Sequence, residues 1–517
     1  MLYRALAGAC ARARVAVMAG ADDTMTDCFS RIVIQQSSAF RYIYLALLES
    51  IRARHHCVIH LYCNTKQDAK FYAPYLNSGL VDSITRTDVL YQAIGQRDLD
   101  EETVLSCARA REAKLGTTIN RLAVTDRHLG RGYALGGFYH PRSHYSEQTN
   151  YLQMVHGYNE LVDFWACEIA EKRPTLMISC GLVAELLAKA GGIPVRSMIG
   201  SRYQNYYYWG RNEFYETPEV EVAYHGLEDA PETGDVDPYL SHMSLRKKFL
   251  RNTTLRGLAR RMVHLTARNF YWRLRRYDKA KAYFLKDELA YFWREWRDTR
   301  KLNGAGALSV ADLGPGQIVY YPLHTEPETA LQALSPEYFY QLSCIAALSR
   351  DLPAGVRLAV KETYAGVGRR PTDFYAQIRE FKNVVMIRMM ELGPEVIQRA
   401  DAVATITGTG GFEAAVMGKP VLTFGRHNIY NFLPHVLCVT DEGKLKSQLA
   451  AALSGEIDAA RAQQDGARFL AAVKATSFDL RDFNMVDLKR FDPTVIEAAN
   501  DKLCESLSRH EDAAAAI

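Results

Sequence analysis

The amino-acid sequence predicts an α/β protein with two domains, each built on a doubly wound parallel sheet, facing each other across a cleft. Two separate series of short β-rich runs alternate with longer helical patterns, which is typical of parallel sheets covered by helices on both faces. An abrupt reversal of charge separates the two series. Of the 517 residues, 48% are apolar, which is enough to fill more than one large core.

The first series begins near residue 30 and predicts an N-terminal domain over 30–240. The runs RIVIQ and CVIHLYC flank an amphipathic stretch at the spacing of a βαβ unit. The expected strands are 31–35, 57–63, 174–180 and 193–200, with helices over 39–54 and 181–192. Residues 1–29 are expected to form a flexible leader, because Arg12 and Arg14 interrupt any apolar core of a signal peptide.

The charge reversal predicts a basic helical connector over 241–312. Residues 214–240 hold eight acids and no Lys or Arg, whereas 246–281 carry thirteen Lys and Arg against one acid. Two interpretations stay open for this basic segment: a surface that binds an anionic membrane, or internal pairing with the acidic run.

Composition excludes several classes of protein. Lys and Arg number 63 against 59 Asp and Glu, so no nucleic-acid partner is indicated. No run approaches about 18 consecutive apolar residues, so no transmembrane helix is expected. The ten cysteines form no C-x-x-C pair, which favours reduced thiols and a cytoplasmic protein.

The second series predicts a C-terminal domain over 313–475, followed by a helical tail over 476–517. Its expected strands are 318–323, 357–362, 384–388, 402–407, 421–425 and 435–439, and helices are expected over 336–350 and 391–400.

A glycine-rich turn is the most informative local feature of this domain. A strand ends at Thr407, the turn runs from Gly408 to Gly411, and a short helix is expected from Phe412 to Met417. Backbone N–H groups at such a turn favour a phosphate. Glu413, expected in the first helical turn, either accepts bonds from ribose hydroxyls or complements the helix dipole.

Three further polar clusters follow expected strands, at the edge where open parallel sheets bind ligands. They are His324 with Glu326, Lys361 with Glu362, and Arg388. His324 could donate to a phosphate or act as a general acid, and Lys361 could offset phosphate charge.

The segments YYPLHTEPE, LPAGVRLAVKE and TITGTGGFEAAVMGKPVLTFG resemble the bacterial capsular polysaccharide biosynthesis family, which includes transferases of the keto-sugar Kdo. The resemblance is strong over 317–440 and looser through 30–215. It implies a GT-B-like fold of two Rossmann-like domains and a metal-independent glycosyltransferase. Such an enzyme would transfer sugar from a nucleotide-activated donor to a glycan or lipid-linked acceptor at the inner face of the cytoplasmic membrane, without a further cofactor.

One departure from the family pattern bears on the donor. Thr363-Tyr364 stands where the family has His-Pro, a pair that in related transferases contacts the phosphate of a CMP-activated sugar. A CMP donor is therefore not favoured. Two alternatives stay open: a nucleotide-sugar 2-epimerase of the same fold, and an inactive scaffold of a polysaccharide assembly complex.

The expected site residues fall into three groups. The catalytic candidates are His324, Glu326 and His140, with Glu147 as a further base. The donor-binding candidates are Lys361, Glu362, Thr407, Gly408, Thr409, Gly410, Gly411 and Glu413. The acceptor-binding candidates are Ser37, Arg202 and Trp209.

The acceptor candidates come from a polar loop at 35–38 and an aromatic segment at 201–215, which could equally be a core-packed sheet edge. No metal is expected, because Asp98-Leu99-Asp100 and Asp235-Val236-Asp237 lie in hydrophilic acidic runs.

Overall fold

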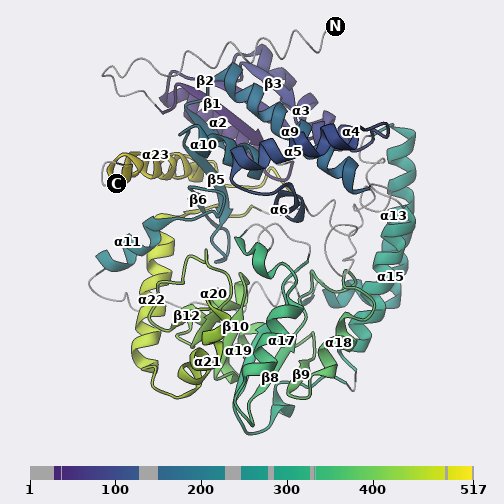
Figure 1. Cartoon of the computed structure of the whole chain (residues 1–517), viewed down its shortest axis with the longest axis vertical. Coiled ribbons are helices and arrows are strands. Elements are labelled where there is room, and N and C mark those ends of the chain that lie inside the picture. The colour runs from purple at the N-terminus through teal and green to yellow at the C-terminus, as the bar shows by residue number, and fades with distance from the viewer. Residues whose placement is uncertain are drawn as a thin grey trace.

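The computed structural model describes residues 28–36, 38–126, 150–227, 246–247, 249–277, 285–304, 306–326, 331, 334–483 and 487–514 (Figure 1). Ser37, His140, Glu147 and the 235–237 motif lie outside the described residues, as does nearly all of the predicted leader. The two predicted α/β units are present, one above the other in Figure 1, and the predicted fold class is confirmed.

The N-terminal unit has a seven-stranded sheet in the order β13-β6-β5-β4-β1-β2-β3. The strands β1 to β5 are parallel, whereas β6 is antiparallel to both β5 and β13. Their bounds are β1 (Arg31–Gln36), β2 (Val58–Cys63), β3 (Ser83–Arg86), β4 (Leu176–Ile178), β5 (Val195–Gly200), β6 (Tyr206–Gly210) and β13 (Phe478–Asp479).

Two apolar cores cover the faces of this sheet, because successive strand residues point to opposite sides. Ile32 and Ile34 join one core, whereas Val33 joins the other. The first core takes α2 (Arg41–Arg54), α3 (Lys66–Asn77) and α23 (Thr494–Ala514). The second takes α4 (Val89–Ala93), α5 (Glu101–Leu115), α6 (Ile119–Val124), α9 (Tyr151–Lys172) and α10 (Leu182–Ala190).

The predicted C-terminal tail returns to this N-terminal unit. β13 adds an edge strand beside β6, and α23 packs on α2. The fully buried Arg196 of β5 donates to the hydroxyl and the backbone carbonyl of Ser506, at 2.8 and 2.6 Å. The last described residues are therefore a structural part of the first unit.

The C-terminal unit has six parallel strands in the order β12-β11-β10-β7-β8-β9. Their bounds are β7 (Ile318–Pro322), β8 (Arg357–Lys361), β9 (Val384–Ile387), β10 (Ala402–Thr405), β11 (Val421–Thr423) and β12 (Val436–Cys438). The helices are α17 (Leu342–Asp351), α18 (Phe374–Glu380), α19 (Gly393–Arg399), α20 (Thr409–Val416), α21 (Leu445–Leu453) and α22 (Ala459–Thr476), with 3₁₀ helices η2 (Ala311–Leu313), η3 (Pro336–Tyr338) and η4 (Glu442–Lys444). The strand order reverses between β7 and β10, which is where such sheets bind ligands.

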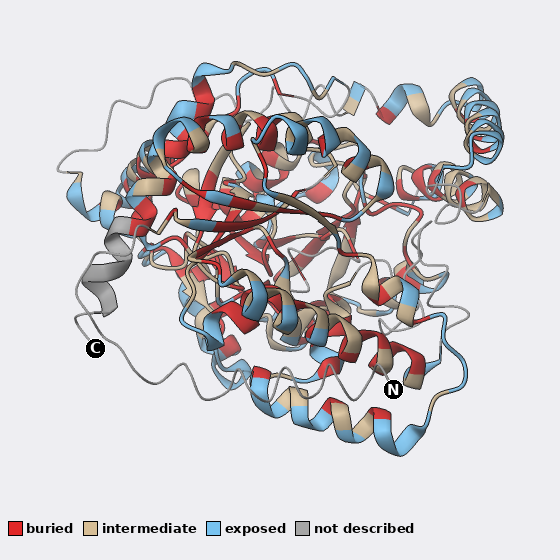
Figure 2. Cartoon of the chain, turned by 90° about the horizontal axis from the view of Figure 1, so that it is seen from above, coloured by how far each residue is buried: buried red, intermediate tan, exposed pale blue. Residues whose placement is uncertain are grey.

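Helices connect the two units. α11 (Pro218–Gly226) packs on α22, and the Tyr224 hydroxyl donates to Asp465 at 2.8 Å. α13 (Leu255–Leu274) packs on α15 (Leu285–Leu302), and this pair stands at the right-hand edge of the molecule in Figure 1. Seen from above in Figure 2, the sheets are largely buried and the exposed surface lies on the surrounding helices. Within the described ranges, none of the helices is long and apolar enough to cross a membrane.

Candidate functional site

His324 lies where the strand order of the C-terminal sheet reverses. It follows β7, and its Nε2 accepts the backbone N–H of Thr407 beyond β10 at 3.1 Å. The Thr405 hydroxyl lies 3.1 Å from the same Nε2 and accepts the Gly408 N–H at 3.1 Å. Because Nε2 accepts a backbone donor, a neutral His324 ring carries its proton on Nδ1.

The Nδ1 atom of His324 is buried and has no hydrogen-bond partner among the described residues. Burial, together with the guanidinium charges of Arg202 and Arg370, lowers the pKa of His324 to about 3, although the neighbouring Gln341 side chain opposes the shift. The ring is therefore neutral at pH 7, and it can donate one hydrogen bond but cannot supply a proton as a general acid. A buried donor without a partner costs roughly 1–3 kcal/mol, which suits a position that awaits a ligand oxygen.

The glycine-rich turn starts α20 earlier than the sequence predicted. The helix begins at Thr409 rather than Phe412, which puts Glu413 in its second turn and not its first. Close packing explains the glycines: a Cβ at Gly408 would lie 2.9 Å from His324 Nε2, and one at Gly411 would lie 2.3 Å from Thr405 Cγ2. The first N–H groups of a helix have no partner within it, so this helix start is suited to an anion.

Lys361, the last residue of β8, is a buried cation on the same rim. Its Nζ lies 3.5 Å from the backbone carbonyl of Glu362 and 5.6 Å from the ring centroid of Tyr364. Burial lowers the pKa of Lys361 to about 8, and the negative charges of Glu362, Glu413 and Glu391 oppose that shift. No carboxylate in the described part of the chain forms an ion pair with Lys361, so a phosphate would be a suitable partner.

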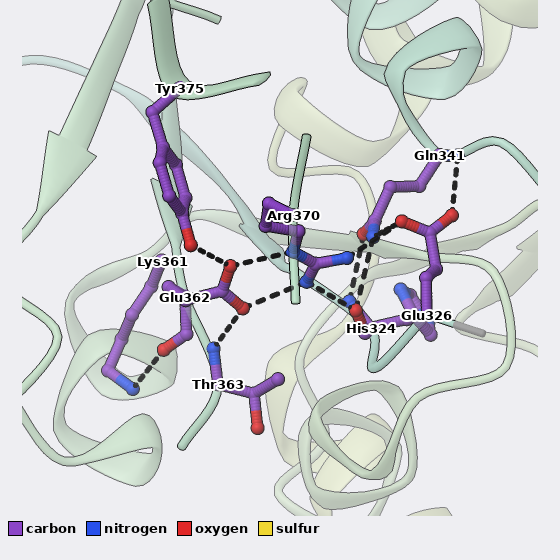
Figure 3. A network of polar contacts seen from close by, with 8 residues as sticks. All are labelled: His324, Glu326, Gln341, Lys361, Glu362, Thr363, Arg370 and Tyr375. Atoms are coloured by element: carbon purple, nitrogen blue, oxygen red, sulfur yellow. Dashed lines mark hydrogen bonds and ion pairs between the residues drawn. The ribbon is translucent and has the colours of Figure 1, made fainter. Parts of the chain in front are cut away.

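Arg370 ties together the loops that follow β7 and β8 (Figure 3). It donates to both carboxylate oxygens of Glu362 at 2.8 Å and to Glu326 at 2.7 Å, and also to the backbone carbonyl of His324 at 2.5 Å. The Gln341 side chain and backbone N–H also donate to Glu326. Burial raises the pKa of Glu326 to about 7, although Arg370 opposes the shift.

These contacts correct two expectations. Glu326, predicted to be catalytic, and Glu362, predicted to bind the donor, are 1% exposed and their oxygens are occupied by neighbouring side chains and backbone. Both carboxylates hold the loops that carry His324 and Lys361, so neither is placed to touch a substrate. No sequence pattern pointed to Arg370, because it lies in a loop without periodicity.

Arg202, in the N-terminal unit, acts on the site through its charge. It follows β5 in a left-handed backbone conformation with φ of 73°, which is unusual for a side-chain-bearing residue and is found at functional sites. Its charge lowers the pKa of His324 and opposes the raised pKa of buried Tyr430. The electrostatics of the site therefore depend on both units. Phe214, twelve residues after Arg202, stacks on His427 of the C-terminal unit, with 3.8 Å between the ring centroids.

The N-terminal unit contains an open cavity of about 340 Å³ at the carboxyl ends of its strands, lined by Gln35, Asn64, Thr87 and Trp165 among others. The Gln35 amide donates to Asn64 at 2.5 Å and to Thr87 at 3.1 Å. Amide, hydroxyl and aromatic groups suit a sugar.

Trp209 and Asp100 lie away from this site. Trp209, predicted to bind the acceptor, is 3% exposed, and its indole N–H donates to the Ala499 carbonyl at 2.9 Å, so it belongs to the core. Asp100 caps α5 through the Thr103 N–H at 2.9 Å. Throughout the described ranges, no three His, Cys, Asp or Glu side chains gather as a metal site.

Part of the chain is similar to a known protein family. Residues 240–464 match the family described as "Capsule polysaccharide biosynthesis protein". These residues contain His324, Lys361, Arg370 and the whole glycine-rich turn. No curated protein matches the chain.

Solved structures similar to this chain are distant. A β-Kdo 2,7-transferase, KpsC of Thermosulfurimonas dismutans, is 12% identical with a TM-score of 0.31, covering 65% of this chain and 89% of its own. HepE of Anabaena in complex with UDP and glucose is 11% identical with a TM-score of 0.29, covering 93% and 100%. The S. aureus MnaA–UDP structure is 9% identical with a TM-score of 0.27, covering 93% and 97%. At these scores the likeness alone assigns no activity.

Proposed function

Because residues 240–464 belong to the capsule polysaccharide biosynthesis family, we propose that this chain is a GT-B-type glycosyltransferase that works without a metal. It transfers a sugar from a nucleotide-activated donor to a glycan or lipid-linked acceptor of a capsular or other cell-surface polysaccharide. We place it in the cytoplasm, at the inner face of the membrane.

One observation carries the proposal most directly. The buried Nδ1 donor of His324 has no partner in the described chain, and it lies at the strand-order reversal beside the start of α20. Such a donor, next to helix N–H groups, is suited to a phosphate oxygen of a nucleotide. Lys361 would offset the phosphate charge, and Arg202 would add charge from the opposite unit.

The remaining roles follow from position. Glu413 is half-buried and close enough to Lys361 to oppose the shift in its pKa, which suits a carboxylate that accepts bonds from ribose hydroxyls. The acceptor would lie toward the N-terminal cavity, where Gln35 and Asn64 offer neutral polar groups. Stabilising the leaving nucleotide by fixed donors supplies most of the catalysis in this scheme.

Nucleotide titration tests the proposal. Calorimetry with CMP, UDP, GDP and CDP should show binding of one of them, and His324→Gln should weaken it by about 10–150-fold, as expected for a lost hydrogen bond to a charged group. His435→Gln is a matched control. His435 is also buried in this unit, but its Nε2 donates to the Ala415 carbonyl at 2.9 Å, so a neutral ring has no proton on Nδ1 to offer a ligand, and the residue precedes β12 instead of following it. Wild-type affinity in the His324 variant would refute the assignment.

Incubation with a UDP-N-acetylhexosamine alone separates the enzymatic alternatives. A transferase leaves the sugar's stereochemistry unchanged without an acceptor, whereas a 2-epimerase converts it. Absence of binding to all four nucleotides would favour a scaffold.

A further inference from the structure

The connector helix α13 has two different faces. Leu258, Leu265 and Asn269 are buried on its inner face, toward α15. On the same side, Arg261 pairs with Glu295, and Arg268 pairs with Glu288 at 2.6 Å. These contacts attach α13 to the molecule through only part of its circumference.

The outer face of α13 is unusually apolar for an exposed surface. Eight of the twelve exposed large apolar side chains among the described residues lie between positions 250 and 293. Four of them on α13 form what we call the outer stripe: Leu255, Val263, Phe270 and Leu274, with exposed fractions of 60, 70, 69 and 71%. At about 100° per residue, they fall within roughly 100° of the helix circumference.

Exposed arginines border the outer stripe. Arg256, Arg260 and Arg273 lie in or beside the same arc, and none forms an ion pair with an acid in the described part of the chain. The helix itself contains no Asp or Glu. The described acids of the 214–240 run have other partners: Glu216 lies against His427, Glu219 against Arg211 and Glu221 against His225.

We propose that α13 lies on an anionic lipid membrane, with the outer stripe inserted at the boundary between headgroups and acyl chains. A positively charged helix whose apolar arc is bordered by arginines is the pattern of interfacial helices. The positive charge of α13 favours a lipid membrane over a second copy of the chain as the partner of the outer stripe. Anionic lipids neutralise the arginines, whereas a second copy would bring two positive helices together. In both cartoons the α13–α15 pair stands at the edge of the molecule, where a flat surface can reach it (Figures 1 and 2). This inference does not depend on sugar transfer.

Co-sedimentation of the full chain with vesicles tests it. The wild-type chain should bind vesicles of phosphatidylcholine mixed with phosphatidylglycerol, and bind pure phosphatidylcholine weakly. The variant Val263→Ser/Phe270→Ser/Leu274→Ser should bind the mixed vesicles at least about tenfold more weakly. A matched control, Leu76→Ser/Tyr151→Ser/Val222→Ser, removes exposed apolar side chains outside the connector and should bind as the wild type does.

A charge variant, melting temperatures and sedimentation velocity test the role of the arginines, the fold of the variants and the oligomeric state. Arg256→Gln/Arg260→Gln/Arg273→Gln should lose the preference for anionic vesicles, and melting temperatures should stay near the wild-type value because all substituted side chains are exposed. Equal binding of the wild type to both vesicles, or unchanged binding of the serine variant, would overturn the proposal. So would sedimentation velocity showing a wild-type dimer that the serine variant abolishes, since a second copy would then cover the stripe.

Discussion

Replacing Lys361 by methionine should make the folded chain more stable at neutral pH. Burial lowers the pKa of Lys361 from 10.5 to about 8, so below pH 8 the folded state carries an ammonium that is better hydrated in the unfolded chain. At about 1.4 kcal/mol per pKa unit, this costs the wild type about 3 kcal/mol at pH 7. Methionine removes that cost and loses two weak contacts, with the Tyr364 ring and with the Glu362 carbonyl at 3.5 Å, together worth about 1 kcal/mol, for a net gain of about 2 kcal/mol.

The sign of the pH dependence follows from the same shift. Between pH 8 and 10.5 the folded chain has released the Lys361 proton, whereas the unfolded chain still holds it. Wild-type stability therefore rises across this window, and the advantage of the methionine variant falls to about 1 kcal/mol or less at pH 10. The nucleotide affinity of the methionine variant should be lower than that of the wild type, because the variant has no charge to offer a phosphate.

Urea denaturation at pH 7 and pH 10 measures both free energies of unfolding, and calorimetry measures nucleotide affinity. Lys419→Met is the control: burial also lowers the pKa of Lys419, but its Nζ donates to the Gln398 and Ala400 carbonyls at 2.9 Å, so this variant should lose stability. The reasoning would be refuted if the Lys361 variant were no more stable than the wild type at pH 7, or if its gain in free energy of unfolding were the same at pH 10.

Three further substitutions test the architecture of the site. Arg370→Gln should cost about 3–5 kcal/mol in urea denaturation, because two buried carboxylates lose their cation; a loss below 1 kcal/mol would contradict the network's role. Glu413→Gln should sharply weaken nucleotide binding in calorimetry while the melting temperature changes little, and intact binding would exclude ribose recognition. Gly411→Ala should lower the free energy of unfolding by about 1–3 kcal/mol, because its Cβ would lie 2.3 Å from Thr405 Cγ2; unchanged stability would mean that the turn can relax.

The parallel strands could be located from sequence because each is a short apolar run between turn signals. The predicted runs at 31–35, 384–388 and 402–407 became β1, β9 and β10 with ends shifted by no more than two residues. β3 was missed because SITR is short and polar, and β13 because a two-residue strand has no pattern to detect. The start of α20 was misplaced because Gly410 and Gly411 disfavour helix, and packing against Thr405 overrides that preference.

The site was predicted in residue type but not in role. Strand ends pointed to His324 and Lys361, yet nothing local distinguishes His324 from Glu326 two residues later. Their roles depend on Arg370 and Gln341, which are distant in sequence, and on Arg202, which arrives from the other unit. Burial and long-range pairing decide which polar residue is available to a ligand.

The return of the chain to its first unit has a consequence for biosynthesis. While the ribosome makes the C-terminal unit, β6 has an unpaired edge and Arg196 lacks the α23 groups that will bind its guanidinium. Such an edge can pair with other chains, and a buried guanidinium with unsatisfied N–H groups opposes compaction. The unit translated first should therefore be among the last parts to mature, and a nascent chain arrested before residue 478 would need protection by a chaperone.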